Sequence, residues 1–220
     1  MTHRICVSIL PQTVAEALPL IEKAEESHAD FIEVRIDNLE AGVDLAGLVA
    51  KAKTPLIATN KSSRTETERQ ATLLNAARRG FKYIDVDLSN PAAKTLAKQV
   101  HASGANCIIS FHDNKGTPSI QELNRILADE LAIGADVCKI VTTATKTEDN
   151  LTLLNFTATA SAKAKIVCFG MGELGKTSRL LSPVFGGFFT FAALEQGSET
   201  APGQMTVVEI KDAYDLLGLK

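Results

Sequence analysis

Short apolar segments rich in β-branched residues recur along this chain at nearly constant intervals, and this periodicity constrains its fold more than any other feature. Eight such segments begin 23 to 30 residues apart, with stretches of helical periodicity between them. Strand and helix alternating eight times, with near-continuous apolar strands, is typical of a parallel sheet covered by helices. The predicted strands are 4–9, 31–36, 55–59, 81–88, 106–111, 136–141, 164–169 and 187–191.

Eight strand–helix units favour closure into a (β/α)8 barrel. Helices are predicted at 13–26, 66–79, 119–133 and 206–217, the first with a capping box formed by Thr13 and Glu16. The alternative is a doubly wound open sheet, which would carry a glycine fingerprint after its first strand, whereas Ile9 is followed here by Leu-Pro-Gln. We therefore expect residues 1–220 to form a single α/β barrel domain with few insertions.

Composition excludes several classes of function. The 23 basic and 26 acidic residues give a net charge of −3, and the chain has no Trp and two Tyr. It lacks both the positive charge and the aromatic platforms expected of a nucleic-acid binder. Its apolar windows are too short for a secretion signal or a membrane span, so we expect a soluble, cytoplasmic protein with no membrane partner.

The four cysteines favour a structural role. Cys6, Cys107, Cys138 and Cys168 each lie inside an apolar strand-like run, and their spacing does not fit a zinc site. We expect buried thiols that act as small apolar side chains, and no metal site.

Lys139 is the most informative residue, since it lies in the middle of an apolar strand. A lysine there is destabilising unless it is paired with an acid or is neutral, and a neutral amine is a nucleophile toward a ketone or aldehyde. An ion pair would explain Lys139 as well as catalysis would. Lys165 lies at the start of its strand, where a structural role is expected.

Polar residues near other strand ends favour the catalytic interpretation. His112 is expected just past the end of strand five, where its imidazole can reach the space above Lys139 and move protons. Glu33, Arg35 and Asp37 alternate along strand two and so share one face. Glu33 could orient His112 and tune its charge.

Six motifs in order resemble the type I 3-dehydroquinate dehydratase family over nearly the whole chain. None is specific alone, but their order and spacing together are. They are Ile-Cys-Val-Ser-Ile at 5–9, Glu-x-Arg-x-Asp at 33–37, Ser-Phe-His-Asp at 110–113 followed by Thr-Pro-Ser at 117–119, Lys-Ile-Val at 139–141, Gly-Lys-Thr-Ser-Arg at 175–179, and Ala-Pro-Gly-Gln at 201–204.

The third strand departs from the family pattern. The family usually has Thr-x-Arg followed by a Glu-Gly-Gly-type segment, whereas this chain reads Thr59-Asn60-Lys61 and, later, Glu66-Thr67-Glu68. We expect Lys61 to replace the arginine, with Arg64 as the alternative. Near the last motif the family often has Ser where this chain has Thr200, which keeps a hydroxyl.

The resemblance implies a Schiff-base lyase of the shikimate pathway of aromatic amino-acid biosynthesis. Lys139 would form an imine with the C3 ketone of the small-molecule substrate 3-dehydroquinate, and His112 would be the general acid and base, without any cofactor. Arg179 would bind the substrate carboxylate, and Thr200 and Gln204 would come from a closing loop at 195–204. Ser8, Glu33, Arg35 and Lys61 would contact the remaining substrate groups or orient His112. A homodimer is one assembly compatible with the sequence.

Two other functions remain compatible with parts of this pattern. A Schiff-base aldolase acting on a phosphorylated sugar would share Lys139, but it needs a phosphate site, for which Gly186-Gly187 and Gly170 with Gly172 are weak candidates. A barrel that binds a partner or metabolite without catalysis would form no imine. The presence of both His112 and Lys139 opposes that alternative.

Overall fold

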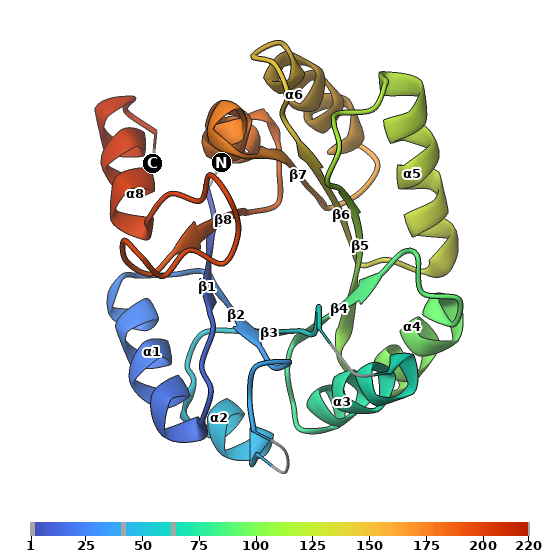
Figure 1. The fold of residues 1–220 in the computed structure, drawn as a ribbon, viewed down its shortest axis with the longest axis vertical. Helices are drawn as coiled ribbons and strands as arrows, with labels where there is room; N and C mark the ends of the chain where they lie inside the picture. The colour runs from blue at the N-terminus through green and yellow to red at the C-terminus, as the bar shows by residue number, and fades with distance from the viewer. Residues whose placement is uncertain (1–2, 41–42, 63–64, 220) are drawn as a thin grey trace.

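The chain folds as a parallel barrel surrounded by helices. The structure is a computed structural model that describes residues 3–40, 43–62 and 65–219. Figure 1 shows the strands as a ring with the helices outside it, and β1 at the start of the chain lies beside β8 near its end. The strands are β1 (Ile5–Ile9), β2 (Phe31–Arg35), β3 (Leu56–Thr59), β4 (Tyr83–Asp87), β5 (Asn106–Asp113), β6 (Val137–Thr143), β7 (Ile166–Met171) and β8 (Thr190–Ala193).

Helices follow the strands in sequence and cover the barrel. They are α1 (Val14–Glu26), α2 (Leu45–Lys51), α3 (Glu66–Arg78), α4 (Ala93–Ala102), α5 (Ile120–Ile133), α6 (Asp149–Ala160), α7 (Lys176–Leu181) and α8 (Val207–Leu216). The 3-10 turns η1 (Glu173–Gly175) and η2 (Ser182–Phe185) flank α7. No helix in the described ranges is both long enough and apolar enough to cross a membrane.

The sheet is entirely parallel, in the order β7-β6-β5-β4-β3-β2-β1-β8. No strand ladder joins β7 to β8 within the described residues. The Phe188 N–H, two residues before β8, instead donates to the carbonyl of Ile166, the first residue of β7, at 2.7 Å. The barrel is thus nearly closed, with its weakest seam between β7 and β8.

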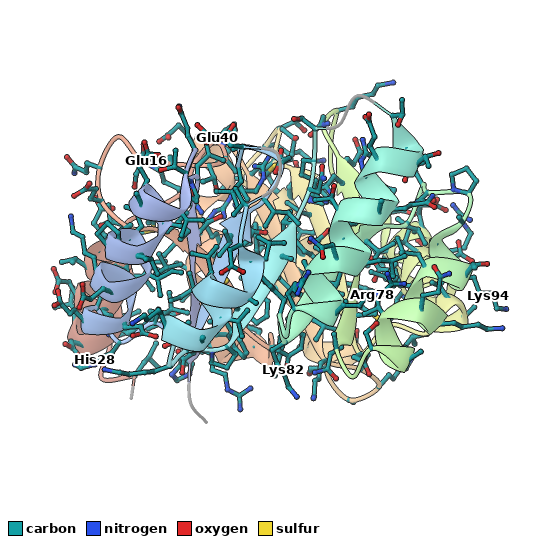
Figure 2. The ribbon with its side chains drawn as sticks, turned by 90° about the horizontal axis from the view of Figure 1, so that it is seen from below. Glu16, His28, Glu40, Arg78, Lys82 and Lys94 are labelled. Atoms are coloured by element: carbon teal, nitrogen blue, oxygen red, sulfur yellow. The ribbon has the colours of Figure 1, made fainter. Side chains whose placement is uncertain are left out.

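Parallel strands place the segments that follow them at one end of the barrel and the segments that precede them at the other. Figure 2 shows this from the side: Glu16 and Glu40, which follow β1 and β2, lie at one end. His28 and Lys82, which precede β2 and β4, lie at the opposite end. Side chains at the last residues of all eight strands therefore converge on one mouth.

Two kinds of core hold the barrel together. Between sheet and helices lie aliphatic clusters such as the one formed by α5, β6, α6 and β7. Inside the ring lies a more aromatic cluster that contains Phe31, Tyr83, Phe189 and Phe191. Period-two alternation produces both, since every strand points one set of side chains to each face.

All eight predicted strands and all four predicted helices are present, with small shifts at their ends. β5 and β6 run two residues further than predicted, to Asp113 and Thr143. The expected capping box at Thr13 is only half formed: Thr13 accepts from the Glu16 N–H, but the Glu16 carboxylate accepts from the Gln12 N–H instead. Complete capping boxes begin α3 and α8.

We predict that Phe156→Ala destabilises the protein by about 3–5 kcal/mol, because truncating a buried phenylalanine leaves a cavity. Phe156 is 1% exposed on α6 and packs in the cluster that supports β6 and β7. Urea unfolding measures the change. Leu151→Ala on the same helix is the control, since Leu151 is 64% exposed and should cost less than about 0.5 kcal/mol. Equal losses in both variants would contradict this account of the core.

Candidate active site

A cavity of about 380 Å³ opens at the carboxyl end of the strands. Its lining contains the last residues of β2, β3, β4 and β7, as expected for the catalytic end of a barrel. The lining residues are Glu33, Arg35, Thr59, Lys61, Asp87, His112, Asn114, Lys139, Val141, Phe169, Met171, Arg179, Phe191, Thr200, Ala201, Pro202 and Gln204. Apart from Ser8, every site residue predicted from the sequence is among them.

The pleat of β5 and β6 stacks the site in layers. Val137, at the start of β6, belongs to the apolar cluster inside the barrel, and two residues further Lys139 lies level with Ser110 of β5. His112 is the next inward residue of β5 and lies level with Val141. The histidine is therefore one layer above the lysine. The prediction that His112 lies past the end of its strand is wrong, because β5 continues to Asp113.

Lys139 is paired with buried acids. Its Nζ donates to Asp85 Oδ2 at 2.8 Å and lies 3.7 Å from Glu33 Oε1, and it sits 4.4 Å from the centre of the Phe191 ring. Burial by itself lowers the pKa of Lys139, but Asp85 and Glu33 outweigh it, so the net shift is upward. The amine is therefore an ammonium in the free enzyme. A lysine kept neutral by burial, one of the two alternatives drawn from the sequence, is not what the structure contains.

Asp85 is a buried acid at the centre of the site that is not among the site residues predicted from the sequence. It is 2% exposed, and its two oxygens serve two lysines: Oδ2 accepts from Lys139, and Oδ1 accepts from Lys61 Nζ at 2.9 Å. Ser110 Oγ also donates to Oδ1, at 2.7 Å. Burial alone raises the pKa of Asp85, but Lys139 and Lys61 bring it far below its usual range. The alternation of Asp85 and Asp87 in an apolar strand is the same signal that singled out Glu33, and it could have located both residues.

Glu33 is held from two sides. One carboxylate oxygen accepts from Thr59 Oγ1 at 2.8 Å, and the other accepts from Ser8 Oγ. Ser8 is 1% exposed and lies level with Glu33 on the neighbouring strand β1, so it holds Glu33 from the side. Glu33 thus faces Lys139, and the expectation that it orients His112 is not matched by its contacts.

His112 is surrounded by both signs of charge. Burial lowers its pKa, Lys61 and Lys139 lower it further, and Asp85 and Asp87 oppose them, with a net result of about 3. The imidazole is thus neutral near pH 7. A neutral imidazole can accept a proton from a substrate bound between His112 and Lys139.

A second charged pair lies on β2 and the turn after it. Arg35 Nε and Nη2 donate to the two carboxylate oxygens of Asp37, at 3.0 and 2.8 Å. The Ser62 N–H donates to Asp37 Oδ2 as well, which ties the segment after β3 to β2. Arg35 therefore presents a fixed guanidinium to the cavity. Arg64, the alternative to Lys61, lies outside the described residues.

Arg179 is a buried cation on the β7 side of the cavity. It is 1% exposed, its Cζ lies 4.2 Å from the centre of the Phe169 ring, and Nη2 donates to the Pro202 carbonyl at 3.4 Å. Its buried Nε has no hydrogen-bond partner among the described residues. Burial lowers the pKa of Arg179 to about 10. A buried guanidinium without a paired acid is suited to an anionic ligand.

The segment that follows β8 folds back over Arg179. Gln204 Oε1 accepts from the Thr200 N–H at 2.7 Å and from Thr200 Oγ1 at 3.3 Å. The Gly172 N–H donates to the Pro202 carbonyl. Gly203 has a φ of +71°, and a Cβ there would lie 2.2 Å from the Gly172 carbonyl oxygen. Only glycine fits this close approach, which places Thr200 and Gln204 at the cavity.

All four cysteines are buried free thiols, as predicted. Across the described ranges, no group of three or more His, Cys, Asp or Glu residues has the arrangement of a metal site.

The structure is thus a (β/α)8 barrel whose mouth holds a lysine, a histidine one layer above it and a buried arginine without a paired acid in the described part of the chain, an arrangement suited to a small anionic ligand. A family model described as type I 3-dehydroquinase matches residues 5–220. A 3-dehydroquinate dehydratase of Methanococcus maripaludis is 33% identical over 223 residues, covering 97% of this chain and 100% of that relative. One from Dehalococcoides mccartyi is 37% identical over 210 residues, covering 91% and 92%. The chain belongs to the type I 3-dehydroquinase family and is an enzyme of that family.

Solved structures agree on the fold. The crystal structure of 3-dehydroquinate dehydratase from Geobacillus kaustophilus has a TM-score of 0.90 at 24% identity, covering 99% of this chain and 92% of that one. The type I enzyme from Clostridium difficile has a TM-score of 0.88 at 24% identity, covering 98% and 92%. Sugar-phosphate enzymes such as deoxyribose phosphate aldolase from Aeropyrum pernix share the barrel less closely, with a TM-score of 0.67.

We predict that the His112 imidazole stays neutral down to about pH 4, because its pKa in the folded protein is about 3. In the unfolded chain a histidine has a pKa of about 6.5. Between about pH 6.5 and 3 the unfolded state therefore binds a proton that the folded state does not, so the free energy of unfolding decreases as the pH falls. Imidazole ¹⁵N NMR during an acid titration measures the charge, with His112→Gln to assign the signal. An imidazole that becomes charged between pH 6 and 7 would contradict this electrostatic account.

Proposed function

We propose that the enzyme converts 3-dehydroquinate to 3-dehydroshikimate through an imine on Lys139, with His112 as the general acid and base. The observation that carries this proposal is the layering of the site: a lysine at the cavity floor and a neutral imidazole one layer above it. A six-membered ring bound between them would offer its ketone carbon to the amine and the neighbouring carbon to the imidazole.

The reaction begins with deprotonation of the Lys139 ammonium. The free amine then attacks C3 of the substrate, and the ketone oxygen leaves as water, which gives a positively charged iminium. The carboxylates of Asp85 and Glu33, at 2.8 and 3.7 Å from Nζ in the free enzyme, stabilise that positive charge. The iminium therefore keeps the favourable electrostatics of the ammonium that it replaces.

Proton transfer then proceeds on the imidazole. His112 removes a proton from C2, and the electron pair of that bond flows into the iminium to form an enamine. The electron pair of the enamine then moves back and expels the C1 hydroxyl, which takes the proton from His112 and leaves as water. Hydrolysis of the iminium consumes one water and releases the product and the amine, so the balance is the loss of one water from the substrate.

Substrate orientation would come from the sides of the cavity. Arg179 would donate to the carboxylate, with Gln204 and Thr200 completing that subsite from the segment after β8. Glu33, Arg35 and Lys61 would contact ring hydroxyls, and the Ser8 hydroxyl would hold the Glu33 carboxylate in place from the neighbouring strand. The iminium is the electron sink, so the proposal includes no cofactor, and a small dissolved substrate fits a cytoplasmic biosynthetic enzyme.

We predict that Lys139→Ala abolishes dehydration, because the variant lacks the amine on which the imine would form. Borohydride reduction in the presence of 3-dehydroquinate, followed by mass spectrometry, should locate one adduct on Lys139 in the wild type and none in the variant. Lys165→Ala is the control and should retain activity. An adduct on Lys165 would overturn the assignment, and adducts formed only with sugar phosphates would favour an aldolase.

His112→Ala should lower kcat by about 10²–10⁴, the range typical of a positioned acid–base group. The variant should still form the imine, since the amine and its acidic partners remain, and trapped adduct should accumulate. Steady-state kinetics together with borohydride trapping measure the two effects separately. Near-normal turnover would refute a proton-transfer role for His112.

Arg179→Lys should reduce kcat/KM by about 30- to 5,000-fold, because loss of one partner of a buried charged hydrogen bond costs about 2–5 kcal/mol. A lysine keeps the charge but loses the planar fork that fixes a carboxylate in rotation. Gln204→Ala should lose less, since a neutral donor contributes less. Kinetics on 3-dehydroquinate test both, and an Arg179→Lys enzyme with full kcat/KM would move the carboxylate subsite elsewhere.

A further inference from the structure

Lys61 occupies a position that substrate binding alone does not explain. Its side chain is 28% exposed at the cavity wall, yet its ammonium reaches down to the buried acid that also holds Lys139. Its Nζ lies 2.9 Å from Asp85 Oδ1, 3.1 Å from Ser110 Oγ and 3.9 Å from Asp87 Oδ2. Two lysines therefore share one buried carboxylate, one on each oxygen.

This sharing has two electrostatic consequences. A second cation on Asp85 offsets the negative charge that holds Lys139 as an ammonium, so deprotonation of Lys139 becomes easier. The same ammonium bonds Ser110 Oγ, two residues before His112 on the same face of β5. After burial, its charge is the largest effect that lowers the pKa of His112. Both catalytic groups must be uncharged at the moment when each begins its step, and Lys61 favours the uncharged form of both.

The other charged groups around the pair do not substitute for Lys61. Arg35 is matched by Asp37 through two hydrogen bonds, and Arg179 lies on the β7 side, stacked on Phe169. The titratable and charged groups that face Lys139 or His112 are Cys6 of β1, Glu33 and Arg35 of β2, Lys61 after β3, Asp85 and Asp87 of β4, and Arg179 of α7.

We propose that Lys61 is a positioning residue that sets the charge state of the catalytic pair: it weakens the hold of Asp85 on the Lys139 ammonium and opposes protonation of His112. This inference rests on the proposed imine mechanism. It gives Lys61 a role that a contact with a substrate hydroxyl does not include.

The test is the pH dependence of kcat/KM for 3-dehydroquinate in Lys61→Met. Removal of one unit charge near a buried group shifts its pKa by about 1–2 units. The rising limb of the pH profile should therefore move to higher pH by that amount. Near pH 7, kcat/KM should fall about tenfold or more, and it should recover at alkaline pH. Lys61→Arg keeps the charge, so its profile should keep the wild-type position even where KM changes.

Lys115→Met is the matched control, since Lys115 is an exposed lysine in the turn after β5 that does not line the cavity. Its profile should not move. Circular dichroism checks folding, and Lys61→Gln serves as a second neutral variant. The imidazole ¹⁵N titration of His112, which needs no substrate, should show an upward shift in both neutral variants.

The outcomes separate this inference from the mechanism on which it rests. A loss in kcat/KM by the same factor at every pH, with an unmoved His112 titration, would make Lys61 a substrate contact only and overturn the inference. An equal shift in Lys61→Arg would also overturn it, because the charge would then be irrelevant. Absence of a borohydride adduct on wild-type Lys139 would instead refute the proposed function itself.

Discussion

The site depends on one electrostatic constraint: an ionised lysine is buried inside the barrel and must be compensated there. Isolated charges are strongly destabilised in such surroundings, whereas a charge with close, hydrogen-bonded partners is tolerated. Asp85 and Glu33 supply that compensation for Lys139, and Ser110, Thr59 and Ser8 hold the two acids in place. Six strands, β1 to β6, thus contribute to one network whose centre is the Nζ atom of Lys139. In the proposed mechanism, an iminium on the same nitrogen would keep the partners that stabilise the Lys139 ammonium.

The network also explains why the interior of the barrel changes character along its axis. Below the lysine the inward side chains are aromatic and aliphatic, from Phe31 to Phe189. Above it charged and polar side chains such as His112 and Arg35 face the cavity, together with apolar ones such as Val141 and Phe169. The lower layers fix the spacing of the strands through packing, and the upper layers then need only side-chain hydrogen bonds to position the reacting groups.

Much of this arrangement could be predicted from the sequence because it follows from local periodicity. The strand–helix alternation predicts the barrel. Because functional residues of such barrels lie at the carboxyl ends of the strands, the sequence also predicts that Glu33, Arg35, Lys139 and Arg179 share one site. Two features could not be obtained in this way. The end of β5 depends on pairing with β6, so His112 was placed beyond its strand. The partner of Lys139 comes from 54 residues earlier in the chain, and no local pattern indicates which acid across the ring meets which lysine.

The seam between β7 and β8 divides the rim of the cavity into two mechanically different halves. β5 and β6 are joined along six residue pairs, whereas no ladder joins β7 to β8 within the described residues, and the Phe188 N–H just before β8 donates to the Ile166 carbonyl at the start of β7. Cooperative opening events concentrate where contacts are fewest. Transient separation of the barrel wall is therefore expected to begin at this seam, on the side of Arg179 and the segment carrying Gln204. His112 and Lys139 lie on the continuously paired strands β5 and β6, so such a fluctuation would leave the spacing between these two side chains unchanged.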